Sequence, residues 1–432
     1  MMNKDDLVNL GRTPIESQWH SLKLKTDGAP PLYNDSGLNS QDICQWIVHN
    51  LGNVWHTRFT PYPTYSDPAT NNGIFEIQKD PAEPVSIALI ADWASNTVES
   101  HTIATQAGAN DYSVHLGDTY YVGSSDEISE NFDPDNNGPW PYGTLGSFAL
   151  AGNHELYSGG ESFYTELLPM MGAYEADNDS PVQVQEGGFF CLENAYWRII
   201  GLDTGYDSLT GIADADNTNL DLTDEQKDWL TNTVNLNGDN RGVIILTHHQ
   251  CISGFENQYP NPMNFISGLM NPARNILWLA GHEHWFSVYG PNQLPNGANI
   301  YYRCIGNGGM PVELFTGNAG IKKPKDTNNI HNPVNCNLVL FDQRQREILP
   351  NGVKLGHNGY VILQLQQNNA VISYYDDNNL AAEGRKILEE SWAVDTGTGE
   401  LKGTGIKDLT NFFGADLMQQ LSLFGDDISD AQ

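Results

Sequence analysis

Five short apolar runs, each ending in polar residues, are the feature that most limits what this 432-residue chain can fold into. The runs are VSIALIAD (85–92), YSVHLGD (112–118), SFALAGNH (147–154), VIILTHH (243–249) and NILWLAGHEH (275–284). Apolar runs of this length, separated by helical or loop segments, are typical of buried strands in an α/β sheet. Ligands usually bind at the carboxyl ends of such strands, which is where these runs place their polar residues.

The distribution of these runs predicts one large domain with an extension at each end. Residues 1–80 show little sustained period, although apolar spacing predicts a helix from Ser40, and we assign this N-terminal segment no role. Residues 81–380 contain all five runs and are expected to form the main domain. Residues 381–432 are expected to form a C-terminal extension.

Three segments inside the main domain carry predictions of their own. Residues 223–236 have the pattern of a helix, with a capping box between Thr223 and Gln226. Two alternating runs over residues 359–376 predict a β-hairpin. Residues 122–146 are rich in Gly, Asp, Asn and Pro and predict a long loop. That loop is either a lid over a site or a surface insertion.

The net charge of −33, from 54 acidic and 21 basic residues, limits the possible partners. Such a field repels nucleic-acid backbones and anionic membranes, so neither is an expected partner. The five cysteines are scattered without a CxxC pair, so they are expected to be free thiols. The first residues lack an apolar signal segment, and no run approaches the roughly 20 apolar residues of a spanning helix, so we expect a cytoplasmic protein.

The polar residues at the strand ends have the chemistry of metal ligands. Hard cations prefer carboxylate, phenolate and amide oxygens, and imidazole suits iron, zinc and manganese. Five histidines are concentrated at these ends, which favours a shared site over scattered structural roles. The candidate ligands are Asp92, Asp118, Tyr121, Asn153, His248, His282 and His284.

The ordered motifs resemble those of a known superfamily. ADW (91–93), GDTYY (117–121), GNHE (152–155), THHQ (247–250) and GHEH (281–284) are similar to the five motifs of the calcineurin-like metallophosphoesterases. Ala94 stands where the first motif usually has histidine, and Tyr121 follows the motif aspartate by three residues. That combination resembles the purple acid phosphatases. The resemblance covers roughly residues 85–310 and implies an α/β fold, a four-layer α/β/β/α sandwich of the metallo-dependent phosphatase type.

The resemblance also implies two metal ions, Fe(III) together with Fe, Zn or Mn. The first ion would be bound by Asp92, Asp118, Tyr121 and His284, with Asp118 as the bridge. The second site would be completed by Asn153, His248 and His282.

The catalytic role implied for His154 is to stabilise the transition state or to protonate the leaving oxygen, with His249 as a second candidate. The implied reaction is hydrolysis of a phosphoric ester by in-line attack of a metal-bridging hydroxide. A small phosphomonoester is the expected substrate. A phosphodiesterase of the same superfamily, or a metal-binding module without useful turnover, is the alternative.

Three further features lie near the motifs in the sequence. Asp203, at the end of the run RIIGLDT (198–204), is expected to be structural. Trp93 and Tyr120 either line the pocket or pack in the core. The run GNGGMP (306–311) is expected to form a tight loop near the opening of the site.

Overall fold

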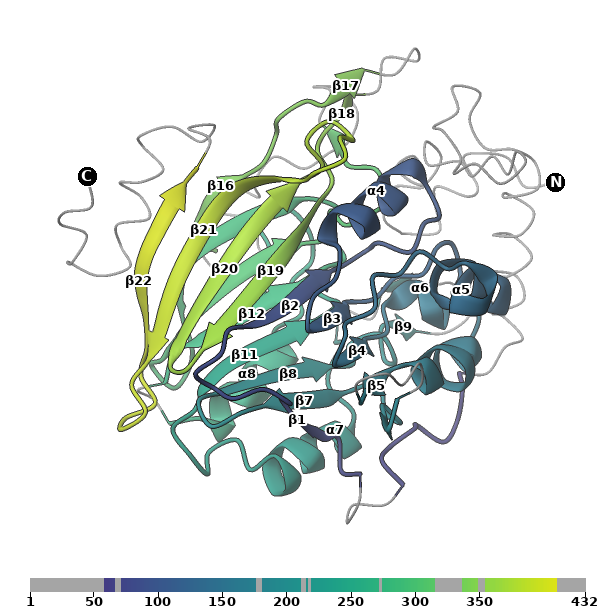
Figure 1. Cartoon of the computed structure of the whole chain (residues 1–432). Coiled ribbons are helices and arrows are strands. Elements are labelled where there is room, and N and C mark those ends of the chain that lie inside the picture. The colour runs from purple at the N-terminus through teal and green to yellow at the C-terminus, as the bar shows by residue number, and fades with distance from the viewer. Residues whose placement is uncertain are drawn as a thin grey trace.

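The computed structural model describes residues 58–66, 71–175, 181–210, 215–216, 219–271, 274–314, 336–348 and 354–409. The helix predicted from Ser40 lies outside these residues. Two large β-sheets form the centre of the molecule, and short helices lie outside them (Figure 1).

The first sheet has nine strands in the order β22-β21-β20-β19-β2-β3-β4-β5-β6. Its strands β2, β3 and β4 are parallel, and β19 to β22 add antiparallel neighbours beside β2. The bounds are β2 (Val85–Ile90), β3 (Tyr112–His115), β4 (Gly146–Ala149), β5 (Gly172–Ala173), β6 (Gln183–Val184), β19 (Gly359–Gln366), β20 (Asn369–Asp376), β21 (Arg385–Val394) and β22 (Leu401–Asp408).

The second sheet has eight strands in the order β1-β7-β8-β11-β12-β14-β13-β16. Its central strands β8, β11, β12 and β14 are parallel. The bounds are β1 (Ile74–Glu76), β7 (Phe190–Glu193), β8 (Trp197–Leu202), β11 (Gly242–Thr247), β12 (Ile276–Ala280), β13 (Phe286–Gln293), β14 (Asn299–Ile305) and β16 (Leu338–Phe341). Two small sheets contain β9 (Leu209–Thr210) with β10 (Ala215–Asp216), and β15 (Glu313–Leu314), β17 (Glu347–Ile348) and β18 (Lys354–Leu355).

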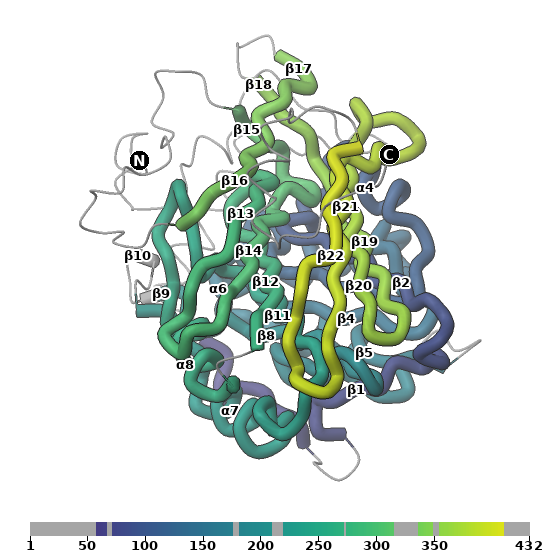
Figure 2. Tube along the Cα trace, turned by 90° about the vertical axis from the view of Figure 1, so that its left-hand side faces the viewer, coloured from purple at the N-terminus to yellow at the C-terminus, as the bar shows by residue number. Residues whose placement is uncertain are grey.

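The two large sheets pack face to face around one apolar core. Phe148 of β4 stacks on Phe190 of β7, with ring centroids 4.6 Å apart. At the other end of the interface, Arg303 of β14 forms a buried ion pair with Glu390 of β21, at 2.6 Å between Nη2 and Oε2. Figure 2 shows β12 to β14 and β19 to β21 as two neighbouring layers. Sheet-to-sheet packing of this kind buries the apolar faces of both sheets.

The helices form the outer layers. They are α4 (Val98–Ala107), α5 (Ser125–Phe132), α6 (Asn153–Leu156), α7 (Asp224–Asp228) and α8 (Pro260–Leu269), with short 3₁₀ turns at Pro134–Asn136 and Leu168–Met170 and π-helical stretches at Phe163–Leu167 and Trp229–Thr233. Contacts join α4 to β19 on the outside of the nine-stranded sheet. The predicted α/β sandwich of four layers is therefore confirmed, as are the five strands expected at the motif runs and the hairpin over residues 359–376.

Two predictions of local structure were wrong in part. The segment 122–146 contains the helix α5, whose start is fixed by a capping box between Ser124 and Glu127. Thr223 does cap α7 by accepting from the Gln226 backbone, but the side chain of Gln226 does not complete the box. It bonds instead to the backbone N–H and carbonyl of Asp203, because that strand end offers a buried donor and acceptor.

The nine-stranded sheet continues beyond residue 380 through β21 and β22. The domain boundaries at residues 80 and 380 stay predictions. In the part of the chain that the structure describes, no helix has the length and apolar character needed to cross a membrane.

Candidate metal centre

The centre forms where the loops after five strands meet. Parallel strands present their carboxyl ends at the same edge of a sheet, so the residues that follow β2, β3 and β4 converge. The residues that follow β11 and β12 converge in the same way in the opposite sheet. Because the two sheets are packed together, six of the seven predicted ligands lie in one network of contacts: Asp92, Asp118, Asn153, His248, His282 and His284.

The backbone turns sharply at three of these residues. Asp92, Asp118 and His282 have φ angles of 53°, 73° and 70°. Left-handed conformations are uncommon outside glycine and cluster at functional sites, where the surrounding structure holds them. Gly152 leaves the room that this packing needs, since a Cβ atom there would lie 2.1 Å from Asp118 Oδ1. The strand ends are therefore shaped to aim these side chains at one place.

The first cluster consists of Asp92, Asp118, Tyr120 and His284. The phenol oxygen of Tyr120 lies 3.1 Å from Asp92 Oδ1, 3.1 Å from Asp118 Oδ2 and 2.9 Å from His284 Nε2. His284 Nε2 is 3.5 Å from Asp92 Oδ1. The Tyr120 phenol oxygen therefore lies within hydrogen-bond distance of both carboxylates and of His284.

The phenol in this cluster belongs to Tyr120, whereas the sequence predicted Tyr121. The backbone at Tyr121 is fixed by α5, because the Glu127 carboxylate accepts from the N–H groups of Tyr121, Val122 and Ser124. The carbonyl of Tyr121 accepts from His154 Nδ1 at 2.7 Å. These contacts hold the backbone of Tyr121. The phenol that lies beside the two carboxylates is that of Tyr120. A ligand role for Tyr121 stays a prediction, and Tyr120 is the stronger candidate.

The second cluster consists of Asp118, Asn153, His248 and His282. Asn153 Oδ1 lies 3.2 Å from His248 Nε2 and 3.0 Å from His282 Nδ1. The two imidazole nitrogens are 3.3 Å apart, and His248 Nε2 is 3.3 Å from Asp118 Oδ1. Asn153 is oriented by its amide nitrogen, which donates to Tyr157 Oη at 2.7 Å. Its oxygen therefore faces the cluster.

Most of the atoms that meet in the second cluster are acceptors. His248 Nδ1 lies 2.9 Å from the carbonyl oxygen of Leu116, which can only accept, so that nitrogen carries the proton. The Nε2 atom of a neutral His248 then presents a lone pair. It faces the Asn153 amide oxygen and an oxygen of Asp118. Acceptor atoms gathered in this way repel one another unless a cation lies between them.

Asp118 belongs to both clusters. Its Oδ1 atom faces the second cluster and also accepts from the His154 backbone N–H at 3.1 Å. Its Oδ2 atom faces Tyr120 in the first cluster. The position is suited to a carboxylate that bridges two ions, the role that the family resemblance implies for Asp118.

Burial and charge also favour cations at the centre. Burial and the nearby charges of Asp92 and Glu155 raise the pKa of Asp118 well above its ordinary value. Burial opposes the ionisation of Asp92, but a hydrogen bond with His284 and the His248 imidazole outweigh it and lower its pKa to about 2. Burial lowers the pKa of His248 and His282, which favours neutral rings with free lone pairs. A cation would keep both carboxylates ionised together.

The spacing within each cluster fits a shared ion. Ligand atoms that bind one metal at about 2.0–2.2 Å lie about 3 Å apart. The distances between donor atoms in the two clusters run from 2.9 to 3.5 Å. The residues present therefore fit two metal ions, one in each cluster.

Two histidines flank the clusters, as the sequence predicted. His154 is buried, and its Nε2 atom lies 3.8 Å from Asp118 Oδ2. One ring nitrogen of His249 lies within 4.8 Å of ring nitrogens of His248 and His282. The His249 ring packs on that of His282, with centroids 4.5 Å apart. His154 therefore borders Asp118, and His249 borders the second cluster.

Glu155 has a positioning role that the motif alone did not reveal. Its buried carboxylate accepts from the backbone N–H groups of Asp118, Thr119 and Gly152 at 3.1, 2.6 and 2.7 Å. It therefore joins the loops after β3 and β4. The one sequence feature that draws attention to Glu155 is its position as the last residue of the motif GNHE.

The loop 306–311 also lies against the centre, as predicted. The N–H of Met310 donates to the carbonyl of Asp92 at 2.9 Å, and that of Gly308 donates to the carbonyl of Ala91 at 3.0 Å. Trp93 packs among the rings of His115, Phe132 and Trp140. Of the two alternatives, packing in the core is therefore the one that applies to Trp93. Tyr120 instead lines the site.

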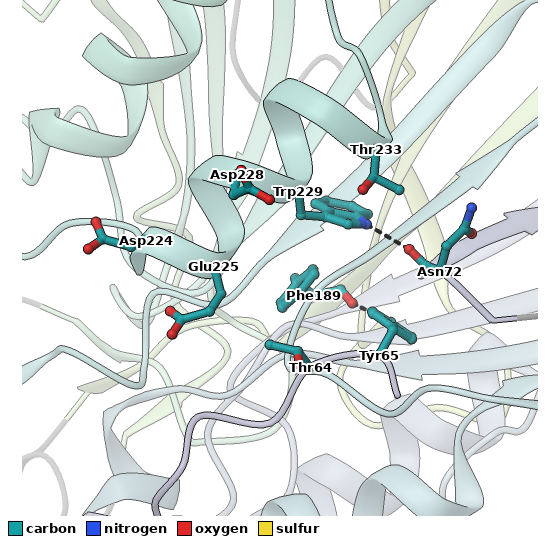
Figure 3. Close-up of a pocket in the computed structure, with 9 residues that line it drawn as sticks. All are labelled: Thr64, Tyr65, Asn72, Phe189, Asp224, Glu225, Asp228, Trp229 and Thr233. Atoms are coloured by element: carbon teal, nitrogen blue, oxygen red, sulfur yellow. Dashed lines mark hydrogen bonds between the residues drawn. The ribbon is translucent and has the colours of Figure 1, made fainter. Parts of the chain in front are cut away.

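Two other groups of polar residues are poor candidates for the same chemistry. His357, Asp376 and Asp377 are close together, but Arg344 and Arg346 already pair with the two carboxylates at 2.8 and 2.9 Å. A separate pocket of about 440 Å³ is lined by Thr64, Tyr65, Asn72, Phe189, Asp224, Glu225, Asp228, Trp229 and Thr233 (Figure 3). It has three carboxylates and no basic side chain, so it is unsuited to an anionic ester.

The chain is similar to several known proteins. Among solved structures it resembles that of PhoD, with 12% identity and a TM-score of 0.45. The match covers 74% of this chain and 72% of that one. It also resembles Vacuolar Protein Sorting 29 from Cryptosporidium parvum, with 9% identity, a TM-score of 0.26, and coverage of 72% and 98%. A single mutant of Vps29 from Entamoeba histolytica has 7% identity, a TM-score of 0.24, and coverage of 75% and 98%. Likenesses this remote carry no conclusion about function.

No curated protein matches the chain. Residues 85–286 match the family model described as calcineurin-like phosphoesterase. That range contains β2 to β12 and every residue of the two clusters. The chain therefore carries a calcineurin-like phosphoesterase domain, the domain of a hydrolase that acts on phosphoric ester bonds.

Proposed function

We propose that the protein is a two-metal phosphomonoesterase with a centre of the purple acid phosphatase type. The observation that carries this proposal is the position of Asp118, whose two oxygens face two separate groups of donor atoms. A single-metal site would need only one such group. The two groups meet on one carboxylate, as a pair of ions roughly 3.5–4 Å apart requires.

The metals proposed for the two clusters differ because the donors differ. Asp92, Asp118, Tyr120 and His284 would hold an Fe(III) ion, since carboxylate and phenolate oxygens suit a hard trivalent cation. Asn153, His248, His282 and the second oxygen of Asp118 would hold Fe, Zn or Mn. When bound, such a pair supplies a nucleophile made from water and neutralises charge on the phosphoryl group.

The surrounding residues would orient the substrate and handle its charge. His154 and His249 flank the centre and can contact the phosphoryl oxygens or the leaving oxygen. Their burial keeps competing water out of these contacts. A small phosphomonoester is the proposed substrate, because it places a terminal phosphate between the two histidines and leaves its other oxygens for the ions.

The test is hydrolysis of a chromogenic phosphomonoester and its diester analogue by protein reconstituted with iron, zinc or manganese. We expect turnover of the monoester, with Asn153→Ala reducing it strongly at unchanged stability. Faster turnover of the diester than of the monoester would show that the protein is a phosphodiesterase and not a phosphomonoesterase. If neither ester reacts with any metal while the protein binds two ions, the binding-module alternative takes its place.

A further inference from the structure

His249 is the one histidine of the centre whose Nδ1 atom meets a side-chain hydroxyl. The Thr204 Oγ1 atom lies 3.1 Å from His249 Nδ1 and also accepts from the His249 backbone N–H at 3.0 Å. Thr204 and His249 are only 1% and 4% exposed. Among the described residues, the Thr204 hydroxyl has no other hydrogen-bond partner.

The positions of the protons follow from the donors available. The backbone N–H already donates to Thr204 Oγ1. If His249 Nδ1 also carried a proton, two donors would point at the same oxygen, and the buried hydroxyl proton would have no acceptor. A buried donor without a partner costs about 1–3 kcal/mol. If the hydroxyl instead donates to Nδ1, every group is satisfied, and the proton of the neutral ring lies on Nε2.

The neighbouring histidines have the opposite arrangement. The Nδ1 atoms of His154 and His248 lie 2.7 and 2.9 Å from the carbonyl oxygens of Tyr121 and Leu116. A carbonyl can only accept, so both rings carry their proton on Nδ1 and present a lone pair at Nε2. His248 can therefore bind a metal, and His154 can donate at Nε2 only when its ring is doubly protonated.

We propose that Thr204 is a positioning residue that holds neutral His249 as its Nε2–H tautomer and so makes it a hydrogen-bond donor to a phosphoryl oxygen, not a third imidazole ligand of the second metal. The tautomer follows from the contacts of Thr204 alone. The role toward a phosphoryl oxygen rests on the proposed function.

The turn that carries Thr204 is itself held by buried contacts. Asp203 Oδ2 accepts from the phenols of Tyr62 and Tyr164 at 3.1 and 2.8 Å, and Asp203 Oδ1 accepts from the Tyr206 backbone N–H at 2.9 Å. Gly205 packs on the loop after β4, where a Cβ atom would lie 2.6 Å from the carbonyl oxygen of Ala151. This network confirms the structural role expected for Asp203, and through Tyr62 it gives the residues before the main domain a part in supporting the site.

The direct test is ¹⁵N NMR of the imidazole nitrogens in zinc-loaded protein labelled at histidine, with His249→Gln to identify the signal. Protonated and unprotonated ring nitrogens have clearly different shifts. We expect a proton on Nε2 in the wild type and in Thr204→Ser, and a loss of this tautomer in Thr204→Val. Thr247→Val is the matched control, because the Thr247 hydroxyl contacts the His249 carbonyl, not its ring.

Inorganic phosphate is the second probe. Its affinity for zinc-loaded protein should fall about tenfold in Thr204→Val and recover in Thr204→Ser, the loss expected for one charge-assisted hydrogen bond. A wild-type His249 with its proton on Nδ1, or an unchanged tautomer in Thr204→Val, would overturn the proposal. The wild-type spectrum decides this even if Thr204→Val does not fold. Failure of the wild type to bind phosphate would contradict the proposed function and the donor role, while the spectrum would still decide the tautomer.

Discussion

The two clusters share Asp118 but are built from different donors. The first combines two carboxylates, a phenol and one imidazole, and the second combines one carboxylate oxygen, an amide oxygen and two imidazoles. The first cluster is therefore richer in oxygen and negative charge, which suits a harder and more highly charged ion. Two ions placed side by side in these clusters would therefore meet different chemical surroundings. Variants that affect one cluster, the other, or both test whether the two clusters bind separate ions.

The largest effect is expected from Asp118→Ala, because Asp118 is the residue that both clusters share. Losing it removes one donor from each group, and we expect monoester hydrolysis to fall at least about 10⁴-fold. Initial rates at saturating metal measure this. Asp111→Ala is the matched control, since Asp111 lies just before β3, at the other end from Asp118, and pairs with Lys79. A loss below about tenfold in Asp118→Ala would show that the clusters do not act together.

Asn153→Ala should affect the second cluster only. It removes the amide oxygen that lies between His248 and His282, and we expect a fall in turnover of about 10²- to 10³-fold. Metal analysis should find the ion of the first cluster retained and that of the second reduced. Equal loss of both ions would contradict the separation of the two clusters.

Tyr120→Phe should affect the first cluster only. If the Tyr120 phenol binds Fe(III), the iron-loaded protein has a visible charge-transfer band that this variant loses, while turnover falls about tenfold or more. Tyr121→Phe is the matched control and should keep the band. Loss of the band in Tyr121→Phe instead would restore the ligand predicted from the motif and show that Tyr120 only lines the site.

The smallest effect is expected from Tyr157→Phe, which removes the acceptor that orients the Asn153 amide. We expect about tenfold weaker binding of the second ion, measured by competition with a chelator, and no change at the first. Tyr174→Phe is a suitable control, because its phenol donates to the Met170 carbonyl away from the centre. An unchanged affinity in Tyr157→Phe would mean that Asn153 needs no such support.

The sequence predicted the strands, and the positions of six candidate ligands at their ends, because both depend on local pattern. Each apolar run ends at a candidate ligand, so recognising the runs as parallel strands places Asp92 beside Asp118 at the edge of one sheet and His248 at the edge of the other. The helix α5 was missed because turn-forming residues dominate its segment, although the pair Ser124 and Glu127 was visible as a capping signal.

The rest of the site depends on contacts between distant parts of the chain. Tyr120 and Tyr121 are both plausible from the motif, and only the anchoring of the backbone by Glu127 separates them. Thr204 meets His249 across 45 positions of sequence, and no spacing rule links a threonine to the tautomer of a distant histidine. Such couplings appear only when the two strand ends are placed side by side.

The metal content of the reconstituted wild-type protein decides whether the centre holds two ions. It is determined by mass spectrometry of the metals after removal of loosely bound ions. The two clusters predict two ions per chain, and fewer than one per chain in Asp118→Ala. A single ion per chain in the wild type, with full activity toward the monoester, would contradict a two-metal centre.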